Sequence, residues 1–179
     1  DLVLKNMNRG YHKSDLYRLF EQLRQSLPDL ILRTTVMVGF PGESDDDFQS
    51  LYDFVKETQF DWLGTFAFTP EEGTAAYNMV EQIPEEIKKE RVNAIMQLQK
   101  GITRKKNKSR LNQWERVLIS SQAAKNLYIG RGYYQAPEVD GITMVKSAVK
   151  LTPGIFAKVQ LKGIRNYDIV GEYINEYPE

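Results

Sequence analysis

The chain has 179 residues and no net charge, with 41% hydrophobic and 27% charged residues, a composition typical of a soluble globular protein. It contains no cysteine, which excludes disulfides, thiol nucleophiles and thiolate metal sites together. The single histidine, His12, lies in a polar stretch before a predicted helix, where a solvated residue is more common than a metal ligand. From the absence of cysteine and the position of the single histidine, we expect no metal ligand in the chain. No apolar run is long enough to cross a membrane, so we expect a cytoplasmic protein without a membrane partner.

The charges are distributed unevenly along the chain. Residues 1–99 carry 10 Lys or Arg against 17 Asp or Glu, residues 100–111 carry six cations and no acid, and residues 112–179 carry 8 against 7. An acidic first part, a basic junction and a near-neutral last part predict two domains, 1–111 and 112–179.

Helix and strand patterns alternate in the first part. Apolar residues at helical spacing predict a helix from Lys13 to Leu27, with Ser14 as its cap and Pro28 after its end. The β-rich run DLILRTTVMVG follows, and Ser44 then caps a second helix. The run has two alternating faces, Leu32, Thr34, Val36 and Val38 on one and Arg33, Thr35, Met37 and Gly39 on the other.

The run FDWLGTFAFTP predicts a second strand, and Pro84 opens a long helix after it. The apolar positions of this helix are Ile87, Ile95, Leu98 and Ile102. Strands that leave by turns into helices predict a parallel α/β arrangement. Because two parallel strands cannot cover both of their faces, we expect part of a larger sheet or barrel.

The pattern of predicted secondary structure changes after Trp114, from alternating helices and strands to strands alone. Five short β-type runs follow, separated by Gly, Pro, Asn and Asp: WERVLISS, LYIGRGYY, GITMVKSAVK, GIFAKVQLKGI and YDIVGEYI. This pattern predicts a small, closed or nearly closed barrel of the oligonucleotide-binding kind. The fold class is therefore α/β followed by all-β.

The stretch VMVGFPGESDDDF joins a strand to a helix through a glycine turn, as many phosphate-binding loops do. It lacks the Gly-Lys-Ser/Thr ending of a nucleotide-binding loop, and its helix begins with Ser44 and three aspartates that already serve the helix N-terminus. A phosphate there would be repelled. The alternatives left open are a neutral or cationic ligand on the glycine backbone and a turn that needs glycine for its backbone angles.

Five stretches in order resemble one family: VLKNMNRGY, RTTVMVGFPGESDDDF, FTPEEGTAA, QIPEEIKKERV and GRGYYQAPEVDG. They are similar to the carboxyl-terminal half of the radical S-adenosylmethionine methylthiotransferases, and most similar to the RimO branch. The resemblance implies the last part of a radical-enzyme partial (β/α) barrel followed by a TRAM-like β-barrel. Since the chain also opens without a methionine, we expect a piece of a longer protein.

The resemblance also implies a reaction and its cofactors. In this family a reduced iron–sulfur cluster cleaves S-adenosylmethionine, and a methylthio group is installed on an unactivated carbon. In the RimO branch that carbon is the β-carbon of an aspartate in small-subunit ribosomal protein S-twelve. The cysteines that hold the two 4Fe-4S clusters lie upstream in the family and are absent here. We therefore expect no catalytic residue in this piece and no activity from it alone.

The expected cofactor site lies on the polar face of the first strand. Met37 and Gly39 are assigned to the adenosine part of S-adenosylmethionine, with Thr35 beside them. Arg33 is assigned to a carboxylate, and the alternative is an ion pair with Glu71 or Glu72. Phe68 and Thr69, on the second strand, are weaker candidates, since a strand aromatic is more often part of the core.

Candidate substrate contacts lie at the rim of the barrel and in the basic stretch. They are Arg9, Glu71, Glu72, Lys105, Lys106 and Arg131. The basic stretch around Lys105 also suits an RNA contact or a solvated helix end. Tyr128, Tyr133 and Tyr134 are assigned either to stacking on bases or to packing on a barrel face.

Three functions compete. The acidic rim and near-neutral barrel favour a protein-modifying enzyme that meets ribosomal protein S-twelve or the ribosome. The nearest alternative is the tRNA-modifying relative of MiaB type. A third is a non-enzymatic module that binds RNA or ribosomes. The argument against it is that an incomplete α/β layer would expose apolar surface in a protein that stands alone.

Overall fold

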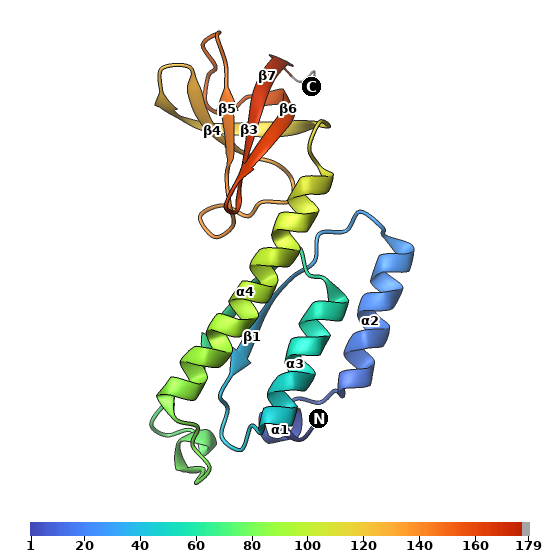
Figure 1. Cartoon of the computed structure of the whole chain (residues 1–179), viewed down its shortest axis with the longest axis vertical. Helices are drawn as coiled ribbons and strands as arrows, with labels where there is room; N and C mark the ends of the chain where they lie inside the picture. Colours follow the sequence, from blue (N-terminus) through green and yellow to red (C-terminus); the bar gives the residue numbers. More distant parts are fainter. Residues whose placement is uncertain (177–179) are drawn as a thin grey trace. The chain divides into compact units, whose positions relative to one another are not determined.

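The structure is a computed structural model that describes residues 1–176, and it forms two compact units, Asp1–Ile102 and Thr103–Glu179 (Figure 1). The first unit contains α1 (Leu2–Asn6), α2 (Lys13–Ser26), β1 (Arg33–Val38), α3 (Asp45–Thr58), β2 (Trp62–Ala67), η1 (Ala75–Asn78) and most of α4 (Glu85–Ser109). The second contains the end of α4 and β3 (Trp114–Ala124), β4 (Leu127–Arg131), β5 (Thr143–Lys146), β6 (Phe156–Arg165) and β7 (Asp168–Glu176).

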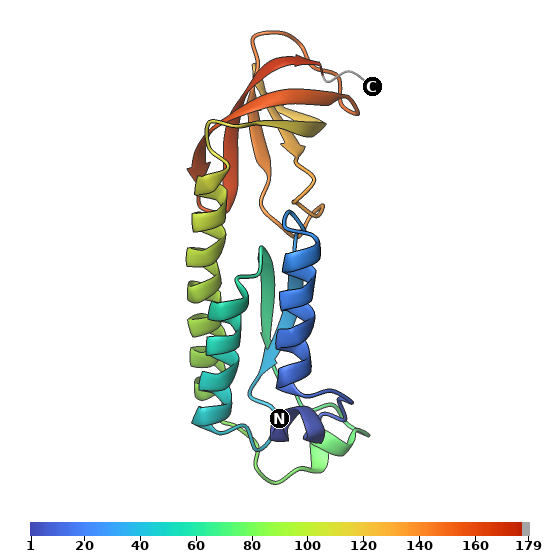
Figure 2. The same cartoon turned by 90° about the vertical axis from the view of Figure 1, so that its right-hand side faces the viewer.

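In the first unit, β1 and β2 form a parallel pair in which Arg33 lies opposite Trp62 and Val38 opposite Ala67. The helices α2, α3 and α4 lie beside this pair, as Figures 1 and 2 show. The core beneath them consists of Leu32, Val38, Phe54, Val55, Phe60, Leu63, Ile95 and Ile102. The parallel α/β arrangement predicted from the sequence is confirmed.

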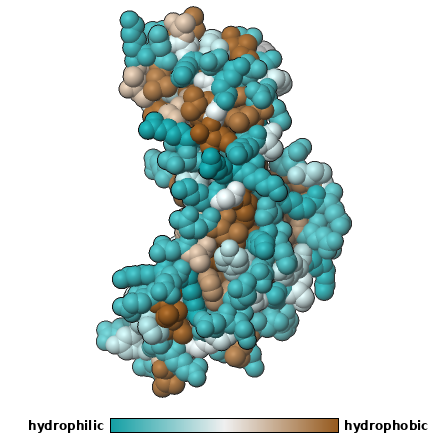
Figure 3. Space-filling view, in the orientation of Figure 1, coloured by the Kyte–Doolittle hydropathy of each residue, from teal (hydrophilic) through white to brown (hydrophobic). Residues whose placement is uncertain are grey.

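The opposite face of the β1–β2 pair is open. Thr35 and Gly64 are exposed there, and the Phe66 side chain is 48% exposed. Figure 3, which shows one side of the molecule, also has hydrophobic residues at the surface in groups separated by hydrophilic ones. A parallel strand pair with one uncovered face is what the sequence led us to expect of an incomplete α/β layer.

The five strands of the second unit close into a barrel in the order β3-β4-β5-β7-β6, which confirms the predicted five-stranded barrel. All neighbouring strands are antiparallel except β5 and β7, which are parallel. The interior is filled by side chains that alternate along the strands, among them Val117, Ile119, Val145, Val159 and Ile169, all fully buried. The barrel is thus a packed core and not a channel.

The division into compact units falls between Ile102 and Thr103, inside α4. The domain limits predicted from composition, 1–111 and 112–179, remain a prediction. Counted over the compact units, the first carries 11 Lys or Arg against 17 Asp or Glu, and the second carries 13 against 7. The barrel together with its stretch of helix is therefore clearly basic, although the barrel sequence alone is nearly neutral.

Ser44 caps α3 as predicted. Its hydroxyl accepts a hydrogen bond from the Asp47 backbone N–H at 3.1 Å and donates one to the Asp47 carboxylate at 2.7 Å. The hydrogen bond from Ser44 is the main cause that lowers the pKa of Asp47 from its ordinary value. A carboxylate whose pKa is lowered by folding stabilises the folded state at pH values above its ordinary pKa. This contribution is lost as the pH falls through the lowered pKa of the folded state.

We therefore expect Ser44→Ala to lower the free energy of unfolding at neutral pH by about 1 kcal/mol, the usual cost of losing an N-cap. The difference between the parent and the variant should shrink as the pH falls through the pKa of Asp47. Urea unfolding at several pH values measures this, with Ser26→Ala at the exposed end of α2 as the control. If the difference in free energy of unfolding between the parent and Ser44→Ala does not change with pH, the cap stabilises α3 without a contribution from the ionised Asp47 carboxylate.

Candidate functional site

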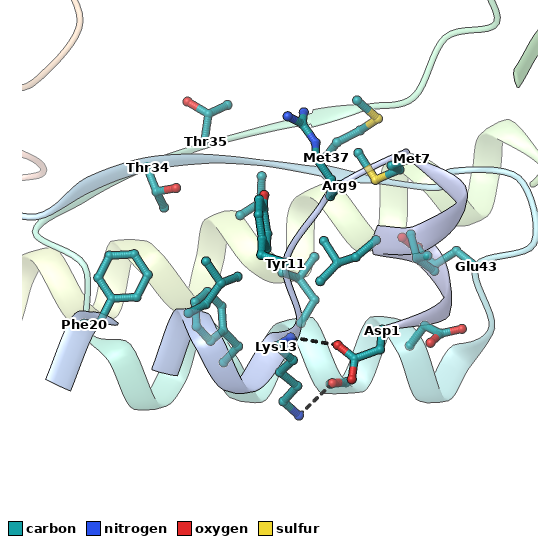
Figure 4. A pocket seen from close by; sticks show the side chains of 18 of the residues that line it. Asp1, Met7, Arg9, Tyr11, Lys13, Phe20, Thr34, Thr35, Met37 and Glu43 are labelled. Atoms are coloured by element: carbon teal, nitrogen blue, oxygen red, sulfur yellow. Dashed lines mark hydrogen bonds between the residues drawn. The ribbon is translucent and has the colours of Figure 1, made fainter. Parts of the chain in front are cut away.

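A cavity of about 480 Å³ opens beside β1 in the first unit (Figure 4). Its walls come from α1, the connection between α1 and α2, one side of α2 and α3, and β1 itself. Among the described residues, β1 pairs only with β2, and Phe66 of β2 also lines the cavity. Side chains from both faces of β1 reach it, Thr34 and Val36 from one and Thr35 and Met37 from the other.

One side of the cavity combines a cation with thioethers. In Figure 4, Arg9 and Met7 lie on the same side of β1 as Thr35 and Met37. Arg9 is exposed, and both methionines are half-buried. A guanidinium next to soft apolar side chains suits a ligand that joins an apolar or aromatic group to a carboxylate.

The other side of the cavity carries acids. The Asp1 carboxylate accepts a hydrogen bond from the Lys13 backbone N–H at 2.7 Å, and the Lys13 ammonium donates to the Ser50 hydroxyl at 2.9 Å (Figure 4). Asp47, with its lowered pKa, and the buried Glu43 also line the cavity. The Glu43 carboxylate is paired with Arg91, so the carboxylates of Asp1 and Asp47 are the ones that favour a ligand with a positive charge in its middle or at one end.

The glycine turn is occupied by the chain's own carboxylate. The Gly39 N–H donates to Glu43 Oε1 at 2.9 Å, and Arg91 on α4 donates to the same oxygen at 2.5 Å and to Asp45 at 2.7 Å. Glu43 and Arg91 are both buried. Since Glu43 already takes the turn amide, this turn offers no place for a phosphate, in agreement with the analysis of its sequence.

Comparison with known proteins relates both units to one family. Residues 113–174 match the TRAM domain. Over 171 residues, 96% of this chain, the sequence is 57% identical to the "Ribosomal protein uS12 methylthiotransferase RimO" of Syntrophomonas wolfei, of which it covers 39%. Proteins of the same name from Aquifex aeolicus and Acetivibrio thermocellus are 44% and 43% identical over 96% and 98% of the chain, which covers 40% and 39% of them. Over almost its whole length, the chain is thus similar to part of the RimO proteins. It spans about two fifths of the length of these relatives.

The structure brings together three of the site residues predicted from the sequence, since Arg9, Thr35 and Met37 all line the cavity. Arg33 and Thr69 are exposed and lie outside its lining. Gly39 is buried, and a Cβ there would overlap Cγ of Lys88 and lie 3.0 Å from its Cδ. The turn therefore needs glycine both for its φ of +75° and for the close passage of Lys88.

Phe68 packs in the interior of the first unit. It is 8% exposed, its ring centroid lies 5.2 Å from that of Phe40, and Lys88 Nζ lies 5.7 Å from its centroid. This is the core position that the sequence analysis left open as the alternative for a strand aromatic.

The remaining predicted substrate residues are not among those that line this cavity. Glu71 and Glu72 are exposed in the turn before η1, where the Glu71 carbonyl accepts from the Thr74 hydroxyl at 2.7 Å. Lys105 is exposed and Lys106 half-buried near the end of α4, and Arg131 is half-buried at the end of β4. The last three belong to the second unit, and their roles remain predictions.

Two of the three tyrosines assigned to base stacking are buried. Tyr128 is 2% and Tyr134 3% exposed, whereas Tyr133 is 64% exposed. The Tyr128 hydroxyl accepts from the Leu151 N–H at 3.1 Å, and the Arg110 guanidinium lies 4.0 Å from the Tyr134 centroid. Packing, the alternative left open, is therefore the role of Tyr128 and Tyr134.

Sequence reasoning missed several cavity residues, notably Met7, Tyr11, Lys13 and Phe66. Met7 and Tyr11 flank Arg9 in the stretch NMNRGY, so the resemblance that singled out Arg9 could also have found them. Nothing local marks Lys13 or Phe66, because only the packing of α2 beside β1 and β2 brings them to the cavity.

Residues 1–176 contain no group of three or more His, Cys, Asp or Glu side chains placed to hold a metal ion. With no cysteine in the chain, these residues do not fit an iron–sulfur cluster. In the same range, no helix combines the length and the hydropathy needed to cross a bilayer.

Proposed function

We propose that this chain is part of a radical S-adenosylmethionine methylthiotransferase that modifies the β-carbon of an aspartate in ribosomal protein uS12. The observation that carries the proposal is the 57% identity, over 96% of the chain, to a protein of that name. The cavity beside β1 supports it, because its lining joins a guanidinium, thioethers and acids. With a ribosomal substrate, we expect the protein to act in the cytoplasm.

S-Adenosylmethionine matches the chemistry of the cavity in three respects. Met37 and Met7 offer soft apolar contact for the adenosine portion, with the Thr35 hydroxyl beside them. The acids on the opposite side suit the sulfonium and the amino group of the methionine portion. When bound beside a reduced cluster, this cofactor supplies the radical that removes hydrogen from the substrate.

Arg9 is the residue we assign to a carboxylate, that of the methionine portion or that of the target aspartate. Sequence reasoning offered Arg33 for this role and Arg9 for the rim, but only Arg9 lines the cavity. An arginine binds a carboxylate through two parallel hydrogen bonds, which orient the carboxylate, and its positive charge balances that of the carboxylate.

The cofactor set has to be completed outside this chain. Two 4Fe-4S clusters need thiolates, and the chain has no cysteine. We therefore propose that these 179 residues alone do not transfer a methylthio group.

The decisive experiment uses cells that lack the gene for the full-length protein. We expect uS12 from these cells to lack the mass of one methylthio group and tRNA nucleosides to be unchanged. An unmodified tRNA adenosine together with normal uS12 would show instead that the protein belongs with the tRNA-modifying relatives. Normal uS12 and normal tRNA would leave only a binding role for the chain and overturn the proposal.

In the full-length protein, Arg9→Ala is expected to reduce methylthio transfer about 10- to 100-fold, the value of a hydrogen-bonded charge pair. Arg9→Lys should recover part of the loss, since it restores the charge but not the paired geometry. Arg18→Ala, an exposed arginine on α2 outside the cavity lining, is the matched control. The assignment fails if Arg9→Ala is as active as Arg18→Ala in a quantitative assay of uS12 modification.

A further inference from the structure

A glycine lies in the middle of β2, on the open face of the β1–β2 pair. Gly64 is exposed there, opposite Thr35 in the register and two residues before Phe66. A glycine inside a strand makes the strand less stable than an alanine would, because its backbone loses more conformational freedom on folding. The position therefore needs an explanation beyond the stability of the strand.

The usual structural reasons for a strand glycine do not apply to Gly64. The register between β1 and β2 runs without a shift along all six residues of each strand, so there is no β-bulge. The backbone at Gly64 is not in the left-handed region that favours glycine. Among the described residues, the atoms nearest to a Cβ placed here are those of the Thr35 side chain at 3.7 Å, which is an ordinary van der Waals contact. No described residue thus needs the space that the glycine leaves.

The remaining common reason for a glycine inside a strand is the close approach of a ligand or of another backbone. The surroundings of Gly64 suit such an approach. Thr35 is exposed beside it, Phe66 is 48% exposed on the same face, and Arg33 is exposed at the start of the same face of β1. We call the surface formed by Arg33, Thr35, Gly64 and Phe66 the bare strip.

The bare strip adjoins the candidate cofactor cavity without being part of it as a whole. Thr35 and Phe66 line the cavity, whereas Arg33 and Gly64 do not. The strip offers open backbone, a hydroxyl and an aromatic ring, which suit a polypeptide backbone that carries small or apolar side chains. The guanidinium of Arg33 at one end suits an acidic side chain in the same polypeptide.

We propose that the bare strip receives the segment of the substrate protein that carries the target aspartate, and that Gly64 leaves the room for the backbone of this segment. The inference rests on the proposed function and adds to it the place of the protein substrate. The target carbon has to lie next to the cofactor, and the strip meets the cavity at Thr35 and Phe66.

Two other occupants of the strip would give different results in a test. One is S-adenosylmethionine itself, reaching beyond the cavity. The other is a part of the full-length protein that lies outside this chain. A larger side chain at position 64 separates the three, because it blocks only the group that approaches there.

The test uses the full-length protein with its clusters and fluorescently labelled uS12 from cells that lack the gene. Binding of uS12 is followed by anisotropy, and binding of S-adenosylmethionine by equilibrium dialysis. We expect Gly64→Val to weaken uS12 binding about 10- to 100-fold, as overpacking of a filled space does, and to raise the KM for uS12 by the same factor. Gly64→Ala should have a smaller effect in the same direction, and binding of S-adenosylmethionine should stay at the parent value in both.

Gly163→Val is the matched control. Gly163 is a strand glycine of β6 in the second unit, and it also has no atom within 4 Å of the place that a Cβ would take. In the 179-residue chain, Gly64→Val is expected to unfold at a urea concentration at least as high as the parent, since nothing in the described residues opposes the larger side chain. Loss of uS12 binding without loss of stability would therefore support the proposal.

Three results would overturn the proposal. The first is uS12 binding by Gly64→Val equal to that of Gly163→Val. The second is an equal loss of S-adenosylmethionine binding, which would place the cofactor on the strip. The third is unfolding of the full-length Gly64→Val protein but not of the 179-residue variant, which would place another part of the full-length protein there. A parent that neither binds nor modifies uS12 would refute the proposed function as well, whereas an active parent with an equally active Gly64→Val refutes this inference alone.

Discussion

Replacing Arg91 with methionine is expected to lower the free energy of unfolding of the first unit by about 3–5 kcal/mol, the usual cost of removing one partner of a buried ion pair. Arg91 reaches from α4 to the glycine turn, where it binds Glu43 and Asp45. Asp45 is exposed and returns to water when the cation is lost, but Glu43 is buried and keeps only the Gly39 N–H as partner among these groups. The uncompensated Glu43 charge is the source of the expected loss.

Urea unfolding followed by Trp62 fluorescence measures the effect, in a Trp114→Phe background so that emission reports the first unit alone. Lys89→Met is the control, because Lys89 is an exposed cation on the same helix. Adding Glu43→Gln to Arg91→Met should recover part of the lost stability, since it removes the unpaired charge. If Arg91→Met and Lys89→Met unfold at the same urea concentration, the buried pair does not hold α4 to the turn.

The parts of this fold that local sequence patterns determine were predictable. The helix expected from Lys13 to Leu27 is found as Lys13–Ser26, and Ser44 caps α3 as its sequence indicated. The cap expected for the first of these helices was wrong: its N-cap is His12, and Ser14 lies within the first turn. The five strands of the barrel follow from alternation and from the turn residues between them. In each case the determining residues lie within one element or beside it.

The buried face of α4 was predictable only in part, since Ile95 and Ile102 are buried as the apolar spacing indicated. Apolar spacing marked Ile87, which is 37% exposed, whereas Lys88 and Arg91 are 2% and 6% exposed. Arg91 faces inward because Glu43, more than forty residues earlier in the chain, accepts its hydrogen bonds, and the Lys88 side chain passes beside Gly39 of the same turn. A hydrophobic pattern cannot reveal a buried polar partner that only the tertiary fold supplies.

The same limit applies to the candidate site. The alternation of β1 placed Thr35 and Met37 on one face, and both line the cavity. Arg9, and not Arg33, lines the cavity with them. This depends on the path of the segment between α1 and α2, whose sequence has no hydrophobic periodicity from which the path could be predicted.

The second large effect is expected at Gly39, where two separate constraints act on one residue. Its φ of +75° costs an alanine about 1–2 kcal/mol, and the Lys88 side chain, which a Cβ at this position would overlap, adds an overpacking cost of about 1–3 kcal/mol. Lys88 cannot easily move aside, because it is buried and its ammonium binds Glu85 at 2.7 Å. Gly39→Ala should therefore lower the free energy of unfolding by about 2–5 kcal/mol.

Two other glycines separate these causes. Gly73 has a φ of +83° and no atom within 4 Å of the place that an alanine methyl group would take, so Gly73→Ala should cost only the backbone part. Gly101 lies in α4 with neither constraint, and Gly101→Ala should stabilise the helix by about 1 kcal/mol. If close passage of Lys88 matters, Gly39→Ala will cost less in a Lys88→Ala background than in the parent, approaching the value at Gly73. Equal costs in the two backgrounds would show that the backbone angle alone makes glycine necessary at this turn.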